Sequence, residues 1–165
     1  MPRTNATTGR AKRGNGSPDA LRLLKDDHAR VLSMFEELQK AETPSAKETI
    51  ASTICEELTL HTLLEELIFY PAVRAALEDD EIMNEADVEH ASAKALIGRI
   101  QECDASDQHF EAMVKVLGES IRHHVKEEEG KMFKQAKSAG VDFEQLGARM
   151  RAFKEDQGAG SFSQP

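Results

Sequence analysis

Four segments of the chain carry an apolar stripe whose members recur at steps of three and four residues. This spacing places each stripe on one face of an α-helix. The segments cover about residues 18–42, 45–77, 82–103 and 106–138, and short connections join them. Amphipathic helices joined in this way predict an all-α protein built as an up-down-up-down four-helix bundle.

Capping and helix-breaking residues predict where the helices begin and end. Ser17, followed by Pro18 at the first helical position, is expected to open the first helix. Thr43 and Pro44 end that helix and start the second. Pro71 removes a backbone donor and is expected to kink the second helix near its end.

A short fifth helix is predicted after the bundle. Gly140 is placed to terminate the fourth helix. Asp142 with Gln145 resembles a capping box for a helix that runs to about Lys154. We therefore expect residues 18–156 to form one folded domain.

The two ends of the chain differ from this domain in composition. Residues 157–165 are expected to form a flexible tail. Residues 1–17 contain no acid and are expected to be a disordered basic tail. Their charged residues are Arg3, Arg10, Lys12 and Arg13. Because the whole chain has a net charge of −9, the domain itself is acidic, and we expect it not to bind nucleic acid.

The sequence also bears on location. No apolar run approaches the roughly 20 residues that span a membrane, and the N-terminal segment lacks the apolar region of a secretory signal. Cys55 and Cys103 form no CxxC pair and favour reduced thiols, although a bond between them stays open. These features predict a cytoplasmic protein with no membrane partner.

Each long helix has a histidine in place of one member of its apolar stripe, and the second and fourth helices add a glutamate one turn later. These six residues are His28, His61, Glu65, His90, His124 and Glu128. Residues four apart share a helix face, so each His–Glu pair can hold one ion. A single histidine on such a stripe is usually a hydrogen-bonded core residue. Burial of six ionisable groups in one interior, however, would destabilise the fold by roughly several kcal/mol unless metal ions compensated them.

The ligand types narrow the choice of metal. Four imidazoles and two carboxylates are too rich in nitrogen for Mg²⁺ or Ca²⁺, and the lack of a thiolate argues against a structural zinc site. Two ions that share two bridging carboxylates would keep open positions for solvent or a diatomic ligand. The pattern is typical of a di-iron carboxylate centre inside a four-helix bundle.

The same residues make the chain similar to the hemerythrin-like family, in particular to the bacterial HHE cation-binding domains. The matching stretches are LLKDDHARVLSMFEEL around His28, HTLLEELIFYP around His61, EH at His90 and HHVKEEEGKMF around His124. They span about residues 18–152. The resemblance implies that the four histidines ligate two iron ions, which Glu65, Glu128 and an oxo or hydroxo group bridge.

The chain departs from the oxygen-carrying hemerythrins, which use five histidines. One turn before His90 stands Ala86, which cannot ligate, so the resemblance favours reaction with O₂, peroxide or NO over reversible oxygen carriage. Four further residues are expected around the ligands: Glu66, Tyr70, His123 and Glu129. Direct ligation by Tyr70 stays open as the lesser alternative, and we expect His109 to be exposed.

Several functions are compatible with such a centre. The protein could bind O₂, peroxide or NO and report oxygen or iron status, or it could be an oxidoreductase that decomposes peroxide or handles NO. Iron storage or delivery and a purely structural metal are further alternatives. Turnover, the electron donor and any protein partner stay open.

The helical register predicts which glutamates matter. Replacing Glu65 or Glu128 with alanine is expected to lower iron to about one per chain or none and to abolish the oxo-bridge absorption. Because Glu66 and Glu129 lie about 100° further around the helix, their replacement should leave about two irons per chain. Elemental analysis and absorption spectroscopy measure both effects. If Glu65→Ala kept its iron and Glu66→Ala lost it, the predicted helical register would be wrong by one residue.

Overall fold

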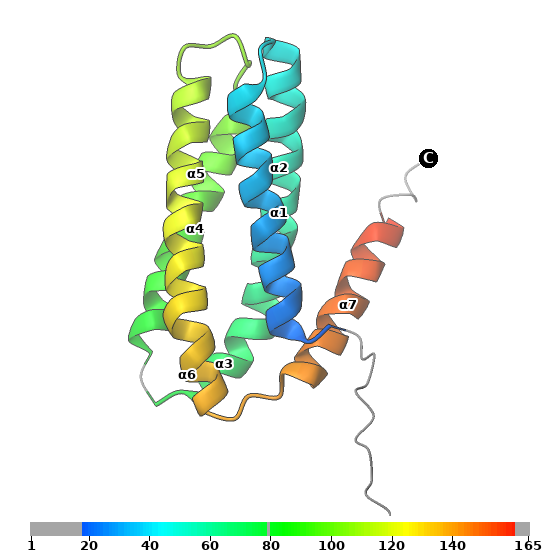
Figure 1. Cartoon of the computed structure of the whole chain (residues 1–165), viewed down its shortest axis with the longest axis vertical. Helices are drawn as coiled ribbons and strands as arrows, with labels where there is room; N and C mark the ends of the chain where they lie inside the picture. Colours follow the sequence, from blue (N-terminus) through cyan, green and yellow to red (C-terminus); the bar gives the residue numbers. More distant parts are fainter. Residues whose placement is uncertain (1–17, 79, 161–165) are drawn as a thin grey trace, which may run out of the picture.

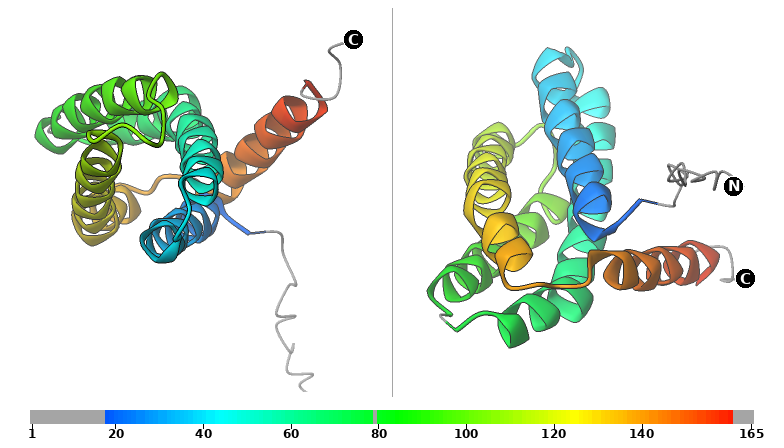
Figure 2. Two further views of the ribbon diagram at one scale, coloured as in Figure 1. Left: turned by 90° about the horizontal axis from the view of Figure 1, so that it is seen from above. Right: turned by 60° about the horizontal axis from the view of Figure 1, so that its bottom comes forward.

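Four helical rods run alternately up and down around a common interior, and a fifth helix leans against one end of them (Figures 1 and 2). The computed structural model describes residues 18–78 and 80–160. The first and third rods are α1 (Ala20–Lys40) and α4 (Glu81–Gln101). The second rod is α2 (Pro44–Leu64), η1 (Glu65–Phe69) and α3 (Tyr70–Ala76). The fourth rod is α5 (Phe110–Glu127), η2 (Glu128–Met132) and α6 (Phe133–Ser138), and α7 (Phe143–Gly160) follows it.

This is the predicted all-α bundle. α1 packs against α2, α4 packs against α5, and α7 packs against α1. The fifth helix is longer than expected, because α7 continues past Lys154 to Gly160. The predicted tail at 157–165 is thus helical over its first residues. The basic segment 1–17 lies outside the described residues.

The first helix starts differently from the prediction. Its capping residue is Asp19, whose carboxylate accepts a hydrogen bond from the Arg22 N–H at 2.9 Å. Ser17, the expected cap, lies outside the described residues. The second helix begins as predicted, since the Thr43 hydroxyl accepts from the Ala46 N–H at 3.2 Å and a proline occupies the first turn.

The fourth rod begins later than the predicted residue 106. Asp104 accepts a hydrogen bond from the Ser106 N–H at 2.8 Å, and Asp107 accepts one from the His109 N–H at 2.7 Å. These short polar side chains hold a turn in place of helix. α5 therefore starts only at Phe110.

The C-terminal end of the bundle follows the prediction. Gly140 adopts a positive φ of 77°, as a helix-terminating glycine does. The Asp142 carboxylate accepts a hydrogen bond from the Gln145 N–H at 2.9 Å and caps α7.

Two five-residue π-helical segments interrupt the second and fourth rods. η1 begins at Glu65 and η2 begins at Glu128, and each closes with a hydrogen bond to the glutamate carbonyl from the N–H five residues later. A π-helical turn lies just before Pro71, near where the kink was expected, and the proline itself lies in the first turn of α3. Because no proline follows η2, a proline is not what the two π segments have in common. Both start at a buried carboxylate.

The apolar stripes face the interior, as their spacing predicted. In the second rod, the stripe residues Ile54, Leu58 and Ile68 are buried and Ile50 is half-buried. The stripe residues of the other three rods are all buried. The buried apolar side chains form two clusters. We call the cluster that contains Leu24 the lower cluster and the cluster that contains Val31 the upper cluster. His28 lies between these two residues along α1. The ligand candidates thus form a polar layer between two apolar clusters.

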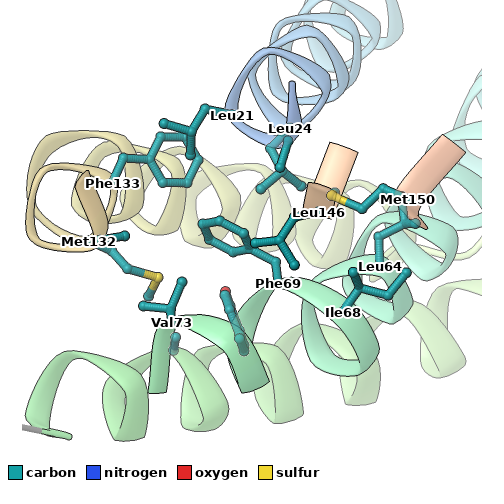
Figure 3. Close-up of a cluster of buried hydrophobic side chains, with 14 of the residues drawn as sticks. Leu21, Leu24, Leu64, Ile68, Phe69, Val73, Met132, Phe133, Leu146 and Met150 are labelled. Carbon is teal, nitrogen blue, oxygen red and sulfur yellow. The ribbon is translucent and has the colours of Figure 1, made fainter. Parts of the chain in front are cut away.

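α7 completes the lower cluster. Leu146 and Met150 contribute its buried contacts (Figure 3). Lys154 adds a bidentate ion pair with Asp27 of α1, with Nζ at 2.7 and 2.6 Å from the two carboxylate oxygens. α7 is therefore anchored to α1 by both apolar and ionic contacts.

Both cysteines are free thiols, with Cys55 buried and Cys103 half-buried. The structure therefore shows no bond between them. None of the helices in the described part of the chain combines the length and apolar character that crossing a bilayer requires.

Two helical glycines test how α7 packs. A Cβ on Gly147 would lie 2.8 Å from the Ala20 backbone nitrogen, whereas a Cβ on Gly98 of α4 would meet nothing within 4 Å. Gly147→Ala should therefore destabilise the fold by about 1–3 kcal/mol through overpacking. Gly98→Ala should stabilise it by about 0.5–1 kcal/mol through helix propensity. Urea unfolding of the two variants measures both signs, and equal effects would contradict the close approach of α7 to α1.

Candidate metal centre

Four histidines, one from each rod, meet in the polar layer. The Nε2 atoms of His28 and His61 lie 3.0 Å apart, and those of His90 and His124 lie 3.4 Å apart. All four side chains are buried. The histidines thus form two pairs, one from α1 and α2 and the other from α4 and α5.

Glu65 joins the two pairs. Its Oε1 lies 3.0 Å from His61 Nε2 and 3.8 Å from His28 Nε2. Its Oε2 lies 3.1 Å from His90 Nε2 and 4.0 Å from His124 Nε2. One carboxylate oxygen therefore faces each histidine pair, and the result is two ligand clusters, His28–His61–Glu65 and Glu65–His90–His124.

Glu128 enters the same layer from η2. Its Oε2 lies 3.2 Å from His28 Nε2, and the residue is 1 % exposed. Burial and the nearby Glu65 charge raise the pKa of Glu128, while His28 opposes that shift. The six residues predicted from the stripes are therefore all brought together.

The buried polar atoms fit a pair of cations. Neither oxygen of Glu65 or of Glu128 accepts a hydrogen bond from the described residues. Buried carboxylate oxygens without such partners are strongly unfavourable. Four imidazole nitrogens converge on the same oxygens, so cations held between them would satisfy both sets of atoms at once.

Each histidine turns its outer ring nitrogen towards a carboxylate on a neighbouring rod. The Nδ1–oxygen distances are 2.9 Å for His28 and Glu129, 3.1 Å for His90 and Glu66, 2.8 Å for His124 and Glu89, and 3.6 Å for His61 and Asp27. A proton on Nδ1 leaves the lone pair of Nε2 facing the interior. The three carboxylates within hydrogen-bond distance, those of Glu129, Glu66 and Glu89, therefore set the tautomer that a metal ligand needs.

The sequence prediction found half of this outer set. Glu66 and Glu129 lie beside the ligands as expected, whereas Asp27 and Glu89 were missed. A signal for the missed pair does exist, because each of them directly precedes a ligand histidine, in the DH of 27–28 and the EH of 89–90. Each points about 100° away from that histidine and meets the histidine of the next rod.

Tyr70 lies closer to the centre than the spacing suggested. Its hydroxyl is 3.1 Å from His90 Nε2, and its side chain is buried. The wider turn of η1 rotates Tyr70 inward, which a regular helix would not do. Burial, and then the charges of Glu65 and Glu128, raise the pKa of Tyr70 well above its usual value, so the phenol keeps its proton.

Two histidines stay outside the centre. His123 is exposed on α5 and contacts it only through Glu89, whose Oε1 lies 3.4 Å from His123 Nε2. His109 directly precedes α5 at the far end of the rod, and it is exposed, as predicted.

Protons stabilise the layer in the metal-free protein. Burial lowers the pKa of His28, but the nearby carboxylates of Glu128 and Glu65 raise it overall to about 11. Burial likewise opposes the charge on His61, yet Glu65 and Asp27 raise its pKa to about 9. Because these pKa values are raised on folding, the stabilisation is complete below about pH 6.5 and is lost as the pH rises through 9 to 11.

A cavity adjoins the histidines. It has a volume of about 380 Å³ and runs from the four imidazoles into the upper part of the bundle. Its apolar walls include Val31, Leu58, Ala93, Ile121 and Val125. Uncharged small molecules are therefore favoured in the space next to the ligand nitrogens.

Metal binding should release protons. At pH 7, His28 and His61 carry a proton in the metal-free protein that a metal ion must displace, so we expect release of about two protons per chain. Calorimetric titration in buffers of different ionisation enthalpy counts them. Affinity should fall as the pH is lowered, because more imidazole is protonated. A binding enthalpy independent of the buffer would contradict this account of the site.

Comparison with known proteins agrees with the geometry. Residues 19–136 match the model of the hemerythrin HHE cation-binding domain. A crystal structure of an HHE cation-binding domain-containing protein from Mycobacterium kansasii superposes with a TM-score of 0.73 at 20 % identity, over 87 % of this chain and 90 % of that one. The low identity makes this a likeness of fold.

A further relative is named a DNA nickase and comes from Nostoc sp. strain PCC 7120. It is 29 % identical over 127 residues, which are 77 % of this chain. The match spans only 35 % of the relative, about a third of its length. The family model itself covers well over half of the chain, and the protein belongs to the hemerythrin HHE cation-binding domain family.

Proposed function

We propose that the polar layer holds two iron ions, bridged by Glu65, Glu128 and an oxo or hydroxo group, and that O₂, peroxide or NO binds or reacts there. One observation carries this proposal. The buried, unpartnered carboxylate of Glu65 directs one oxygen to each of two histidine pairs. A carboxylate shared in this way suits two ions better than one.

The ligand chemistry favours iron. Imidazole nitrogens and carboxylate oxygens suit Fe²⁺ and Fe³⁺, and no cysteine lies in the ligand clusters of the described residues. When bound, such ions supply Lewis acidity and electrons for small oxidants.

The protein's own side chains prepare the site for this chemistry. The outer carboxylates of Glu129, Glu66 and Glu89 hold the imidazoles of His28, His90 and His124 with Nε2 inward, and the apolar surface of the cavity favours uncharged molecules. The Tyr70 hydroxyl, 3.1 Å from His90 Nε2, is a neutral hydrogen-bond donor inside the layer. These groups orient a ligand and can supply a proton.

Ala86 supports reaction over simple carriage. It is buried on α4, one turn before His90, where its methyl group offers no ligand atom. The His90–His124 side therefore has one protein ligand fewer than the five-histidine arrangement. An open coordination position there favours reduction of peroxide or handling of NO as the second form of the proposal.

The name of the Nostoc relative does not extend the proposal. Its similarity to this chain covers only 35 % of its length, so strand nicking can belong to the remainder of that protein. A protein partner and a cytoplasmic location also stay predictions from the sequence.

The proposal predicts about two irons per chain after aerobic purification, with near-ultraviolet absorption that is lost on reduction. Mixing the reduced protein with O₂, NO or hydrogen peroxide should restore or shift those bands. His124→Ala should bind less iron and lose the response. Steady consumption of peroxide would identify an oxidoreductase, whereas a single stoichiometric change would identify a binding or sensing protein. An iron-loaded protein inert to all three would overturn the proposal.

A further inference from the structure

A second opening lies on the surface between the first half of α4 and the end of α5. It is a groove of about 890 Å³. Five acidic residues line it: Asp80, Glu81, Glu85, Glu89 and Glu127. Lys131 is the only lysine or arginine lining it in the described part of the chain. The groove therefore carries a negative field.

The groove leads to a buried ligand candidate. A small crevice of about 10 Å³ shares Glu85, Glu89 and Glu127 with the groove, and His124 and Glu128 form its inner wall. Glu128 is 1 % exposed, and neither of its oxygens accepts a hydrogen bond from the described residues. An unpartnered carboxylate thus lies directly behind the acidic surface.

The acidic residues differ in their contacts between the mouth of the groove and its inner end. Glu127 pairs with Lys131, and Asp80 lies 3.6 Å from Arg74, so these two outer charges are partly neutralised. Glu89 is half-buried, and its two oxygens face His123 at 3.4 Å and His124 at 2.8 Å. Glu89 therefore touches both the groove and the ligand shell. Glu85, which is exposed, lies on the same face of α4 one turn before it.

We propose that this acidic groove is the route by which divalent cations enter, with Glu85 and Glu127 attracting the ion at the surface and Glu89 and Glu128 drawing it to the centre. The inference rests on the proposed function for the identity of the ion, Fe²⁺. Carboxylate oxygens can replace the water ligands of a divalent cation one at a time. A cleft with charges of one sign raises the arrival rate of the opposite charge.

The route is separate in character from the cavity above the histidines. The surface of that cavity is mainly apolar and suits uncharged molecules, whereas the groove is dominated by acidic residues. Val88, Glu89 and His123 border both spaces. The ion and the small ligand would thus reach the same centre through different surroundings.

The fluorescence of Tyr70 can report when an ion reaches the centre. Tyr70 is the single tyrosine and the sequence has no tryptophan, and the Tyr70 hydroxyl lies 3.1 Å from His90 Nε2. Quenching of tyrosine fluorescence on anaerobic mixing of the metal-free protein with Fe²⁺ therefore follows filling of the centre. A stopped-flow instrument gives the rate, and elemental analysis gives the final iron content.

Three charge variants test the route. Glu85→Gln should slow filling by about two- to fivefold at low ionic strength, and Lys131→Gln should accelerate it, both with unchanged final iron content. Added salt should shrink both effects. Glu37→Gln, which removes an exposed charge from α1 outside the groove, is the matched control and should leave the rate unchanged.

The outcomes separate this inference from the proposed function. Equal rates for Glu85→Gln and Glu37→Gln, or slower filling in Lys131→Gln, would overturn the entry route while leaving the di-iron centre intact. Loss of bound iron in Glu85→Gln would also overturn it, because Glu85 would then be a ligand. A wild-type protein that takes up no Fe²⁺ would overturn the proposed function itself.

Discussion

A fully buried carboxylate surrounded by histidines is the constraint on which this structure depends. Glu65 has no exposed surface, and its two oxygens face imidazoles from all four rods. Burial opposes its charge, but His61, His28 and His90 hold its pKa well below the usual value, so it stays ionised. Such a group is tolerable inside a bundle only if cations or protons compensate it. The histidine on each rod follows from that requirement.

The acidic residues around the histidines follow two sequence patterns, and each pattern occurs in two rods. In the first and third rods an acid directly precedes the ligand histidine, as in Asp27–His28 and Glu89–His90. In the second and fourth rods a second glutamate follows the inner one and a π-helical segment begins there. Each acid contacts a histidine on another rod. The ligand layer therefore ties the rods together in addition to the apolar clusters above and below it.

Membership of the HHE cation-binding family agrees with this arrangement. Ala86 is buried one turn before His90 and offers no ligand atom, and Tyr70 places a protonated phenol beside His90. A cavity adjoins the four histidines, and an acidic groove borders that cavity at Val88, Glu89 and His123.

The sequence by itself determined the bundle and its six inward-facing ionisable residues, because stripe positions depend only on helical periodicity, which is local. It also indicated Glu66 and Glu129, since both adjoin a ligand in the chain. Asp27 and Glu89 could not be assigned in this way, because their partners lie on other rods and depend on how the rods face one another. The inward turn of Tyr70 and the length of α7 were likewise decided by tertiary structure. A π-helical turn around a buried carboxylate changes the register beyond it, and α7 persists where Leu146, Met150 and Lys154 find partners on the bundle.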